Sequence, residues 1–246
     1  GDPGSIQYAA LAFVKIHGRR EAAPTESKRM AELHSEAIGG MVEHEWAGGK
    51  SPFAVGSKKL GMWLFIISDS LTFSALLMTY SYMRMSNPWP TPFPMYPAVI
   101  FSTAMTVVLL GSSLTMVMAV AAAHRGNRAT AVKWMIATMI GGAAFIGLHS
   151  YEWLHLIHEG LRTNALPKLP EYAGKSVLFG ATFFGITGLH MTHVAIGVIY
   201  LGIIATGFGR GKFTGEDVEV SGLYWHFVDL VWMFVFPLIY LMSVRY

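Results

Sequence analysis

Five long apolar segments follow a polar stretch that makes up the first 57 residues of the chain. Each segment holds enough consecutive apolar residues to cross the hydrocarbon core of a bilayer as a helix. The pattern predicts an all-α fold, a polytopic membrane bundle of five transmembrane helices over residues 58–246, preceded by a polar cytoplasmic tail over residues 1–57. The predicted spans are residues 60–84, 96–123, 130–157, 177–207 and 221–243.

The connections between these segments are rich in proline, glycine or charge. The run NPWPTPFPMYP at residues 87–97 cannot continue a helix, because proline lacks the amide hydrogen that a helix interior requires. We expect this run to form a tight connection on the outer side of the membrane. Within the tail, the stretch from Thr25 to His44 is expected to form a short surface helix, with Thr25 as its N-cap.

Small residues recur inside the predicted spans, and we expect them to mark close helix packing. Lipid offers no hydrophobic force between helices, so close backbone approach stabilises their association. These residues are Gly111 to Ser113, Gly141 to Ala144, Gly180, Gly185 and Gly188.

Composition supports a membrane protein and excludes several kinds of site. The chain is 53% hydrophobic and 13% charged, whereas soluble domains carry about 25% charged residues, and its mean hydropathy is +0.43. The 246 residues include no cysteine, which excludes disulfides, thiolate metal sites and cysteine nucleophiles. The net charge of +3 is dispersed over loops, so nucleic acid is not an expected partner.

The distribution of Lys and Arg predicts the orientation of the chain. Residues 1–59 and the loops after the second and fourth spans together hold thirteen, and the opposite side holds five. Cytoplasmic loops carry the excess of positive charge. Most of the difference comes from the tail, because the short loops alone hold five on each side. The prediction is a multi-pass protein of the cell inner membrane, with a cytoplasmic N-terminus and a C-terminus outside.

Six of the titratable side chains within the apolar spans are the candidate site residues. A charge in hydrocarbon is costly, so each is expected to face protein, water or another polar group. They are Asp69 near the middle of the first span, Glu152 towards the outer end of the third, His190 and His193 near the middle of the fourth, and His226 and Asp229 in the inner half of the fifth.

Two metal sites are conceivable from these residue types. A di-iron carboxylate site needs two Glu-x-x-His motifs and two further Glu residues, but the chain holds one such motif, Glu152 to His155. A membrane desaturase or hydroxylase would use clustered histidines. The pairs His155/His158 and His190/His193 have a suitable spacing, but they lie on different spans and at different depths.

Other functions remain open on the residues alone. His190 and His226 would be the axial ligands of a haem if they faced each other. A small transporter is disfavoured, because the spans show no internal sequence repeat. In a purely structural role, the polar residues would hydrogen-bond between helices or line a polar or lipid-filled cleft.

Two motifs resemble subunit III of the haem–copper oxidases. Residues 221–236, SGLYWHFVDLVWMFVF, resemble the final helix of that family, whose signature is close to W-H-F-V-D-x-V-W. Residues 179–197, FGATFFGITGLHMTHVAIG, resemble the preceding helix, usually written S-T-F-F-x-x-T-G-x-H-x-x-H-V.

Two weaker matches extend this resemblance. Residues 61–70 resemble the helix with a buried acid, where many members have Glu in place of Asp69. The turn of Tyr151, Glu152 and Trp153 resembles the acidic–aromatic turn of the middle helix. The resemblance is to the short five-helix form and covers about residues 58–243, whereas the tail has no recognisable counterpart.

The resemblance implies a subunit without catalytic, metal or cofactor-binding residues of its own. Haem and copper are expected in partner subunits, with oxidase subunit I, other oxidase subunits and membrane phospholipids as partners. Asp69 would either take part in proton transfer or be a bystander in a lipid-filled cleft. His226 and Asp229 are expected to bind each other, a lipid headgroup or a neighbouring subunit.

The implied function is that of an accessory subunit of a proton-pumping terminal oxidase of the cytochrome c oxidase type. Such a subunit stabilises the catalytic subunit and supports proton uptake and lipid binding in the respiratory chain. The alternatives are subunit III of a quinol oxidase, an accessory subunit of nitric oxide reductase, and a histidine-box membrane metal oxidase.

Overall fold

The computed structural model describes residue 30 and residues 56–168 and 170–245. The surface helix predicted from Thr25 to His44 lies outside these residues, apart from residue 30. The boundary predicted after residue 57 stays a prediction.

Within the described residues, five helices are long and apolar enough to cross a membrane, and they confirm the five predicted spans. They are α3 (Ser57–Ser86), α4 (Ile100–His124), α5 (Arg128–His158), α6 (Leu178–Gly209) and α7 (Gly215–Val235). The π-helix η1 (Met95–Val99) leads into α4, and η3 (Phe236–Tyr240) and η4 (Leu241–Ser243) extend α7. The short helix η2 (Pro170–Tyr172) lies between α5 and α6. The chain is therefore a multi-pass, all-helical membrane protein.

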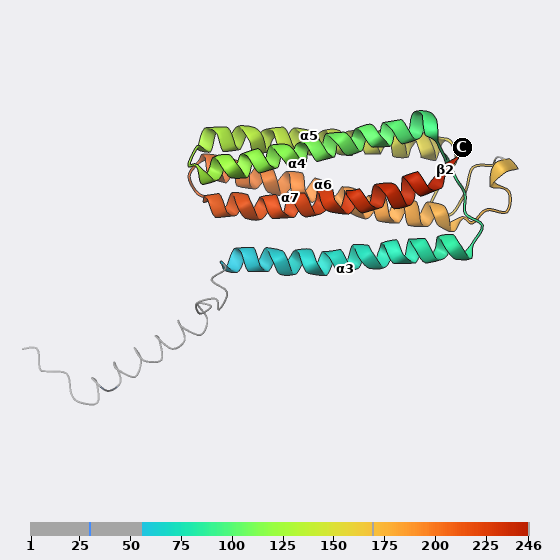
Figure 1. The fold of residues 1–246 in the computed structure, drawn as a ribbon, viewed down its shortest axis with the longest axis horizontal. Helices are drawn as coiled ribbons and strands as arrows, with labels where there is room; N and C mark the ends of the chain where they lie inside the picture. The colour runs from blue at the N-terminus through green and yellow to red at the C-terminus, as the bar shows by residue number, and fades with distance from the viewer. Residues whose placement is uncertain (1–29, 31–55, 169, 246) are drawn as a thin grey trace, which may run out of the picture. The chain divides into compact units, whose positions relative to one another are not determined.

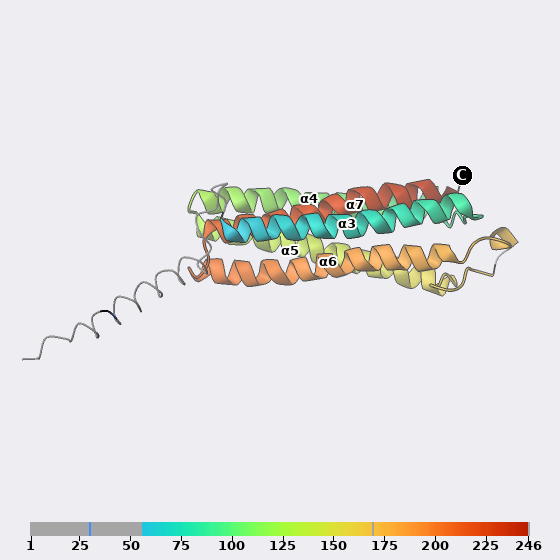
Figure 2. The same cartoon turned by 90° about the horizontal axis from the view of Figure 1, so that it is seen from below.

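Successive helices run antiparallel, and α4, α5, α6 and α7 form a four-helix bundle in which each helix packs on two others (Figure 1). Helix α3 lies outside this ring and packs mainly on α7 and α6 (Figures 1 and 2). Its buried residues are Ile66, Phe73 and Tyr80, which are spaced seven residues apart. A seven-residue spacing places side chains on one narrow stripe of a helix, so α3 is attached to the bundle along a single line.

Helix α7 begins at Gly215, six residues before the predicted start of the last span. Thr214 and Asp217 form a capping box, in which the Asp217 carboxylate accepts the Thr214 amide hydrogen at 2.8 Å. This box satisfies amide groups that have no partner inside a helix. The helix therefore extends beyond the apolar span predicted from residue 221, because its first turns are polar and give no apolar signal.

The proline-rich connection and the C-terminal residues meet at one end of the bundle. Strand β1 (Phe93–Pro94) pairs in parallel with β2 (Val244–Arg245), with Phe93 opposite Val244. The ring of Phe93 also stacks on Tyr240 at 4.8 Å. This pairing ties the segment before α4 to the segment after α7, a detail that the helical pattern did not predict.

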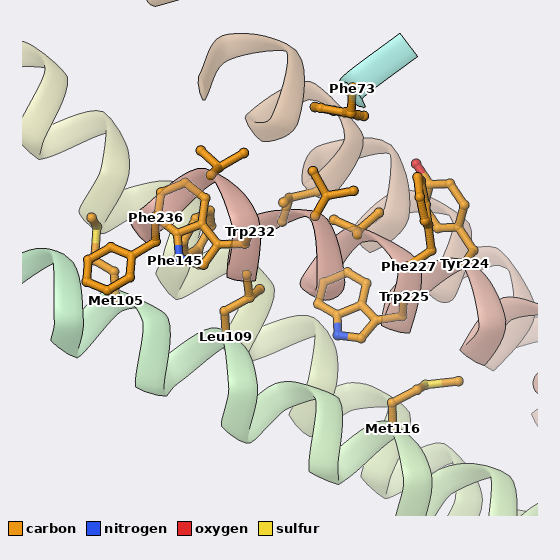
Figure 3. Packing of buried hydrophobic residues seen from close by; sticks show 14 of the residues in the cluster. Phe73, Met105, Leu109, Met116, Phe145, Tyr224, Trp225, Phe227, Trp232 and Phe236 are labelled. Atoms are coloured by element: carbon orange, nitrogen blue, oxygen red, sulfur yellow. The ribbon is translucent and has the colours of Figure 1, made fainter. Parts of the chain in front are cut away.

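The core is centred on α7, whose two tryptophans are fully buried against α4. The indole nitrogen of Trp225 donates to Ser112 Oγ at 3.1 Å, and that of Trp232 donates to Thr106 Oγ1 at 2.9 Å. Figure 3 shows Trp232 beside Phe145. Trp225 lies seven residues earlier on α7, about two helical turns away. Because a buried indole N–H needs an acceptor, these two hydroxyls fix the rotation of α7 about its own axis relative to α4.

The predicted close packing of small residues is confirmed for some glycines and wrong for others. A side chain at Gly142 would overlap the Trp225 ring, and one at Gly141 would come within 2.6 Å of Ser112. By contrast, Gly111 and Gly185 have no neighbouring atom within 4 Å of a Cβ position in the described chain. These two glycines face outwards, because sequence spacing alone does not tell which side of a helix meets a partner.

Candidate functional site

The Asp69 side chain of α3 meets His193 of α6 in the membrane-spanning part of the fold. Their Oδ2 and Nε2 atoms are 3.3 Å apart, and each side chain is 14% exposed. Phe73 packs edge-on against the His193 ring at 5.3 Å, and the Tyr224 hydroxyl donates to the His193 carbonyl at 3.1 Å. Two residues that were predicted separately therefore form one polar contact between α3 and the bundle.

The hydrogen bonds of His193 fix which ring nitrogen faces Asp69. Its Nδ1 atom lies 2.8 Å from the Leu189 carbonyl oxygen. A carbonyl oxygen only accepts hydrogen bonds, so Nδ1 carries the hydrogen. Nε2 is therefore the ring atom that faces Asp69 Oδ2 across the contact between α6 and α3.

Glu152 of α5 is bound inside the bundle near its proline-rich end. Its side chain is 7% exposed, and Ser102 Oγ donates to Oε1 at 2.8 Å while the Tyr240 hydroxyl donates to Oε2 at 2.6 Å. His149 Nδ1 lies 3.4 Å from Oε2. Sequence reasoning missed Ser102 and Tyr240, and no motif marks either as a partner of Glu152.

His190 and His149 lie in the aromatic core next to this carboxylate. The His190 ring stacks on Trp232 at 5.1 Å, and the His149 ring stacks on Phe145 at 5.7 Å. Both histidines are fully buried, and their ring nitrogens have no hydrogen-bond partner among the described residues. Their immediate surroundings are aromatic.

His226 and Asp229 do not bind each other. The Nδ1 atom of His226 is 2.7 Å from Ser113 Oγ on α4. Asp229 is 7% exposed, and its Oδ1 atom has no hydrogen-bond partner in the part of the chain that the structure describes. Of the three partners expected for these residues, contact with each other is not formed in the described chain, because α4 supplies a hydroxyl to His226. Binding to a lipid headgroup or to a neighbouring subunit stays a prediction.

The histidine motifs are not brought together into a metal-binding group. His155 lies at the exposed end of α5, 3.3 Å from Glu159, whereas His190 is buried beside Trp232. Within residues 56–168 and 170–245, no three His, Asp or Glu side chains converge on a point where they could hold a metal ion. His190 and His226 also have different neighbours, Trp232 and Ser113 respectively.

Two hollows accompany these residues. A groove of about 270 Å³ lies between α3 and α7, lined by Phe73 and Leu77 on one side and by Phe227 and Phe234 on the other. It begins at Ser70, next to Asp69 in the chain. A cavity of about 410 Å³ lies between the segment before α4 and the end of α5, and Glu152 is part of its lining.

Comparison with known proteins places these features in a family. The family described as cytochrome c oxidase subunit III matches residues 40–244. The match begins 18 residues before the predicted start of the resemblance, at residue 58. The expectation that the tail has no counterpart was therefore wrong for residues 40–57, because that polar stretch carries no motif that can be recognised from residues alone.

Several relatives share about a third of their residues with this chain. Cytochrome c oxidase subunit 3 of Alkalihalophilus pseudofirmus is 32% identical over 195 residues, which cover 76% of this chain and 88% of the relative. Quinol oxidase subunit 3 of Bacillus subtilis is 35% identical over 75% of this chain and 86% of its own length. Cytochrome bo(3) ubiquinol oxidase subunit 3 of Pseudomonas aeruginosa is 30% identical over 88% of this chain and 96% of its own length. The chain belongs to the cytochrome c oxidase subunit III family.

Proposed function

We propose that this chain is the accessory, non-redox subunit III of a proton-pumping terminal oxidase of the cytochrome c oxidase type. The observation that carries the proposal is the family match over residues 40–244. In this role the chain stabilises the catalytic subunit, in which haem and copper carry out oxygen reduction. Its own polar residues are structural or concerned with lipids and protons.

The partner in this proposal is subunit I, together with other oxidase subunits. Much of the apolar surface of α4 and α5 is available to lipid or to a neighbouring subunit, since Val107, Ile140 and Leu154 are each more than 60% exposed. Helices in a bilayer associate through van der Waals packing and interhelical hydrogen bonds, and a broad apolar face of this kind supplies the first.

The proposed lipid and proton roles both involve α3. An acyl chain of a phospholipid would occupy the apolar groove between α3 and α7, which is lined largely by Phe and Leu side chains. Asp69, which faces His193 beside this groove, would take part in proton transfer on the proton-uptake side of the complex. The distance of 3.3 Å between their facing atoms supports this role.

In the proposed location the bundle spans the cell inner membrane, with its N-terminus in the cytoplasm and its C-terminus outside. The excess of Lys and Arg in residues 1–57 supports this orientation. A protease-protection assay checks this orientation. Each end of the chain is tagged, and a protease added outside spheroplasts should remove the C-terminal tag but leave the N-terminal tag.

Gentle affinity purification of the tagged chain tests the function. The eluate is analysed by a reduced-minus-oxidised spectrum and by metal content. We expect haem bands and a large co-eluting subunit, both of which are lost when that subunit is stripped away. Stoichiometric iron or copper that stays with the isolated chain would contradict the proposal and favour a histidine-box metal oxidase.

A quinol oxidase is the second candidate for the whole complex. It is favoured by the 35% identity to the quinol oxidase subunit 3 of Bacillus subtilis, which is slightly above the 32% identity to the cytochrome c oxidase relative. Oxygen consumption by the purified complex, measured with reduced cytochrome c and separately with a quinol, decides between the two donors.

A further inference from the structure

The cavity at the proline-rich end of the bundle combines acidic and aromatic walls. Phe93 lines it from the segment before α4, Phe101 from the first turn of α4, Tyr151 and Glu152 from α5, and Glu159 from the residue after α5. Its volume is about 410 Å³. No Lys or Arg is among its lining residues in the described chain, and its one histidine, His155, lies 3.3 Å from Glu159 at the exposed end.

Glu152 gives this cavity a carboxylate that is held in place. The hydroxyl groups of Ser102 and Tyr240 donate to different oxygens of that carboxylate, at 2.8 and 2.6 Å. A carboxylate has about four acceptor positions, so these two donors and the His149 Nδ1 atom 3.4 Å from Oε2 leave about one position for a ligand. Because Glu152 is only 7% exposed, an ammonium paired with it would be screened less by salt and water than an exposed pair.

The aromatic walls of the cavity also favour a cationic ligand. The rings of Phe101 and Tyr151, which we call the aromatic ledge, lie 5.9 Å apart at an angle of 54°, and both line the cavity together with Glu152. The face of an aromatic ring attracts ammonium groups, and aromatic pockets are used to recognise them. A primary ammonium meets both demands, since it also donates up to three hydrogen bonds.

The surroundings indicate that this ammonium belongs to a lipid. The cavity lies at the ends of two helices that are long enough to cross a membrane, where headgroups meet the hydrocarbon. Ile100, Tyr151 and Leu154 continue from it as exposed apolar surface, with 54%, 66% and 67% exposure. Such a surface suits acyl chains, whereas a free amine would gain nothing from it.

We propose that this cavity binds the primary ammonium headgroup of a zwitterionic phospholipid. The ammonium lies between Glu152 and the aromatic ledge, and Glu159 lies at the exposed rim. The site is separate from the groove between α3 and α7, since the two share no lining residue. It does not depend on which oxidase the chain serves.

Native mass spectrometry of the full chain in mixed micelles tests the site. The micelles contain either phosphatidylethanolamine or phosphatidylglycerol with identical acyl chains, and the spectra count retained lipids. We expect selective retention of phosphatidylethanolamine, weakened about tenfold by Glu152→Gln, which removes the charge of the acceptor. Glu216→Gln is the matched control, because Glu216 is an exposed acid in the first turn of α7, at the opposite end of the bundle.

A second variant tests the site independently, in case Glu152→Gln does not fold. Phe101→Leu removes the aromatic face and leaves the carboxylate and both of its hydroxyl donors in place. We expect it to weaken retention of phosphatidylethanolamine as well. Equal retention of the two lipids by the native chain, or full retention by both folded variants, overturns the proposal. So does loss of a co-purifying subunit in Glu152→Gln with unchanged lipid retention, which would assign the cavity to a cationic side chain of a partner.

Discussion

His193 Nε2 on α6 lies 3.3 Å from Asp69 Oδ2 on α3. The Leu189 carbonyl occupies the other ring nitrogen of His193, so the side of the ring that faces Asp69 is fixed. The other polar contacts of α3 with the bundle lie near its two ends, where Lys58 pairs with Asp217 and Arg84 donates to Ser243. The contact between Asp69 and His193 therefore attaches the middle of α3 to the bundle.

Asp69→Asn is expected to preserve this attachment, and Asp69→Leu is expected to weaken it. The Asn amide donates to Nε2, so the free energy of unfolding, measured by thermal unfolding in detergent, should change by less than about 0.5 kcal/mol. Leu leaves Nε2 without a partner, at a cost of about 1 kcal/mol, which is typical of interhelical hydrogen bonds in membranes. Equal stability of the two variants would show that the contact does not hold α3.

Gly142→Ala should destabilise the bundle, whereas Gly147→Ala on the same helix should not. A Cβ at position 142 would overlap Trp225, but position 147 has no atom within 4 Å in the described chain. Overpacking of this kind typically costs about 1–3 kcal/mol. Thermal unfolding of the two variants measures the difference, and a stable Gly142→Ala protein would contradict the packing of α5 on Trp225.

Asp217→Ala should cost more than Lys58→Ala, although the two residues form one ion pair at 2.7 Å. The Lys58 side chain is 64% exposed, and exposed ion pairs contribute about 0–1 kcal/mol. Asp217 also completes the capping box of α7, whose loss costs about 1 kcal/mol. Thermal unfolding in detergent compares the stabilities of the two variants. Equal losses of stability would mean that the capping box contributes nothing.

The spans could be predicted because a bilayer imposes a minimum length and an apolar composition on each helix. The partners of the polar residues could not. Ser113, which bonds His226, and Tyr240, which bonds Glu152, lie 113 and 88 residues away from those partners. Such pairings depend on how helices are rotated against each other, and an apolar sequence with little amphipathic bias does not specify that rotation.

For the candidate site, the sequence likewise predicted the residues but not their contacts. Asp69 and His193 were singled out as intramembrane polar residues, but their contact follows from α3 packing on α6. Outward-facing glycines such as Gly111 show the converse, because a small residue indicates close approach only where a partner is present. In the assembled complex that partner can belong to another chain.

Ser243→Ala should loosen the C-terminal strand. The buried Ser243 hydroxyl accepts from Arg84 Nη1 at 3.0 Å and lies 3.1 Å from the Tyr80 hydroxyl. Without it, the segment that carries Val244 loses part of its connection to α3, so hydrogen exchange at the β1–β2 pair should become faster. Ser81→Ala is the control, since Ser81 Oγ donates to the Leu77 carbonyl within its own helix. Equal exchange in both variants would show that pairing with Phe93 alone holds the C-terminal strand in place.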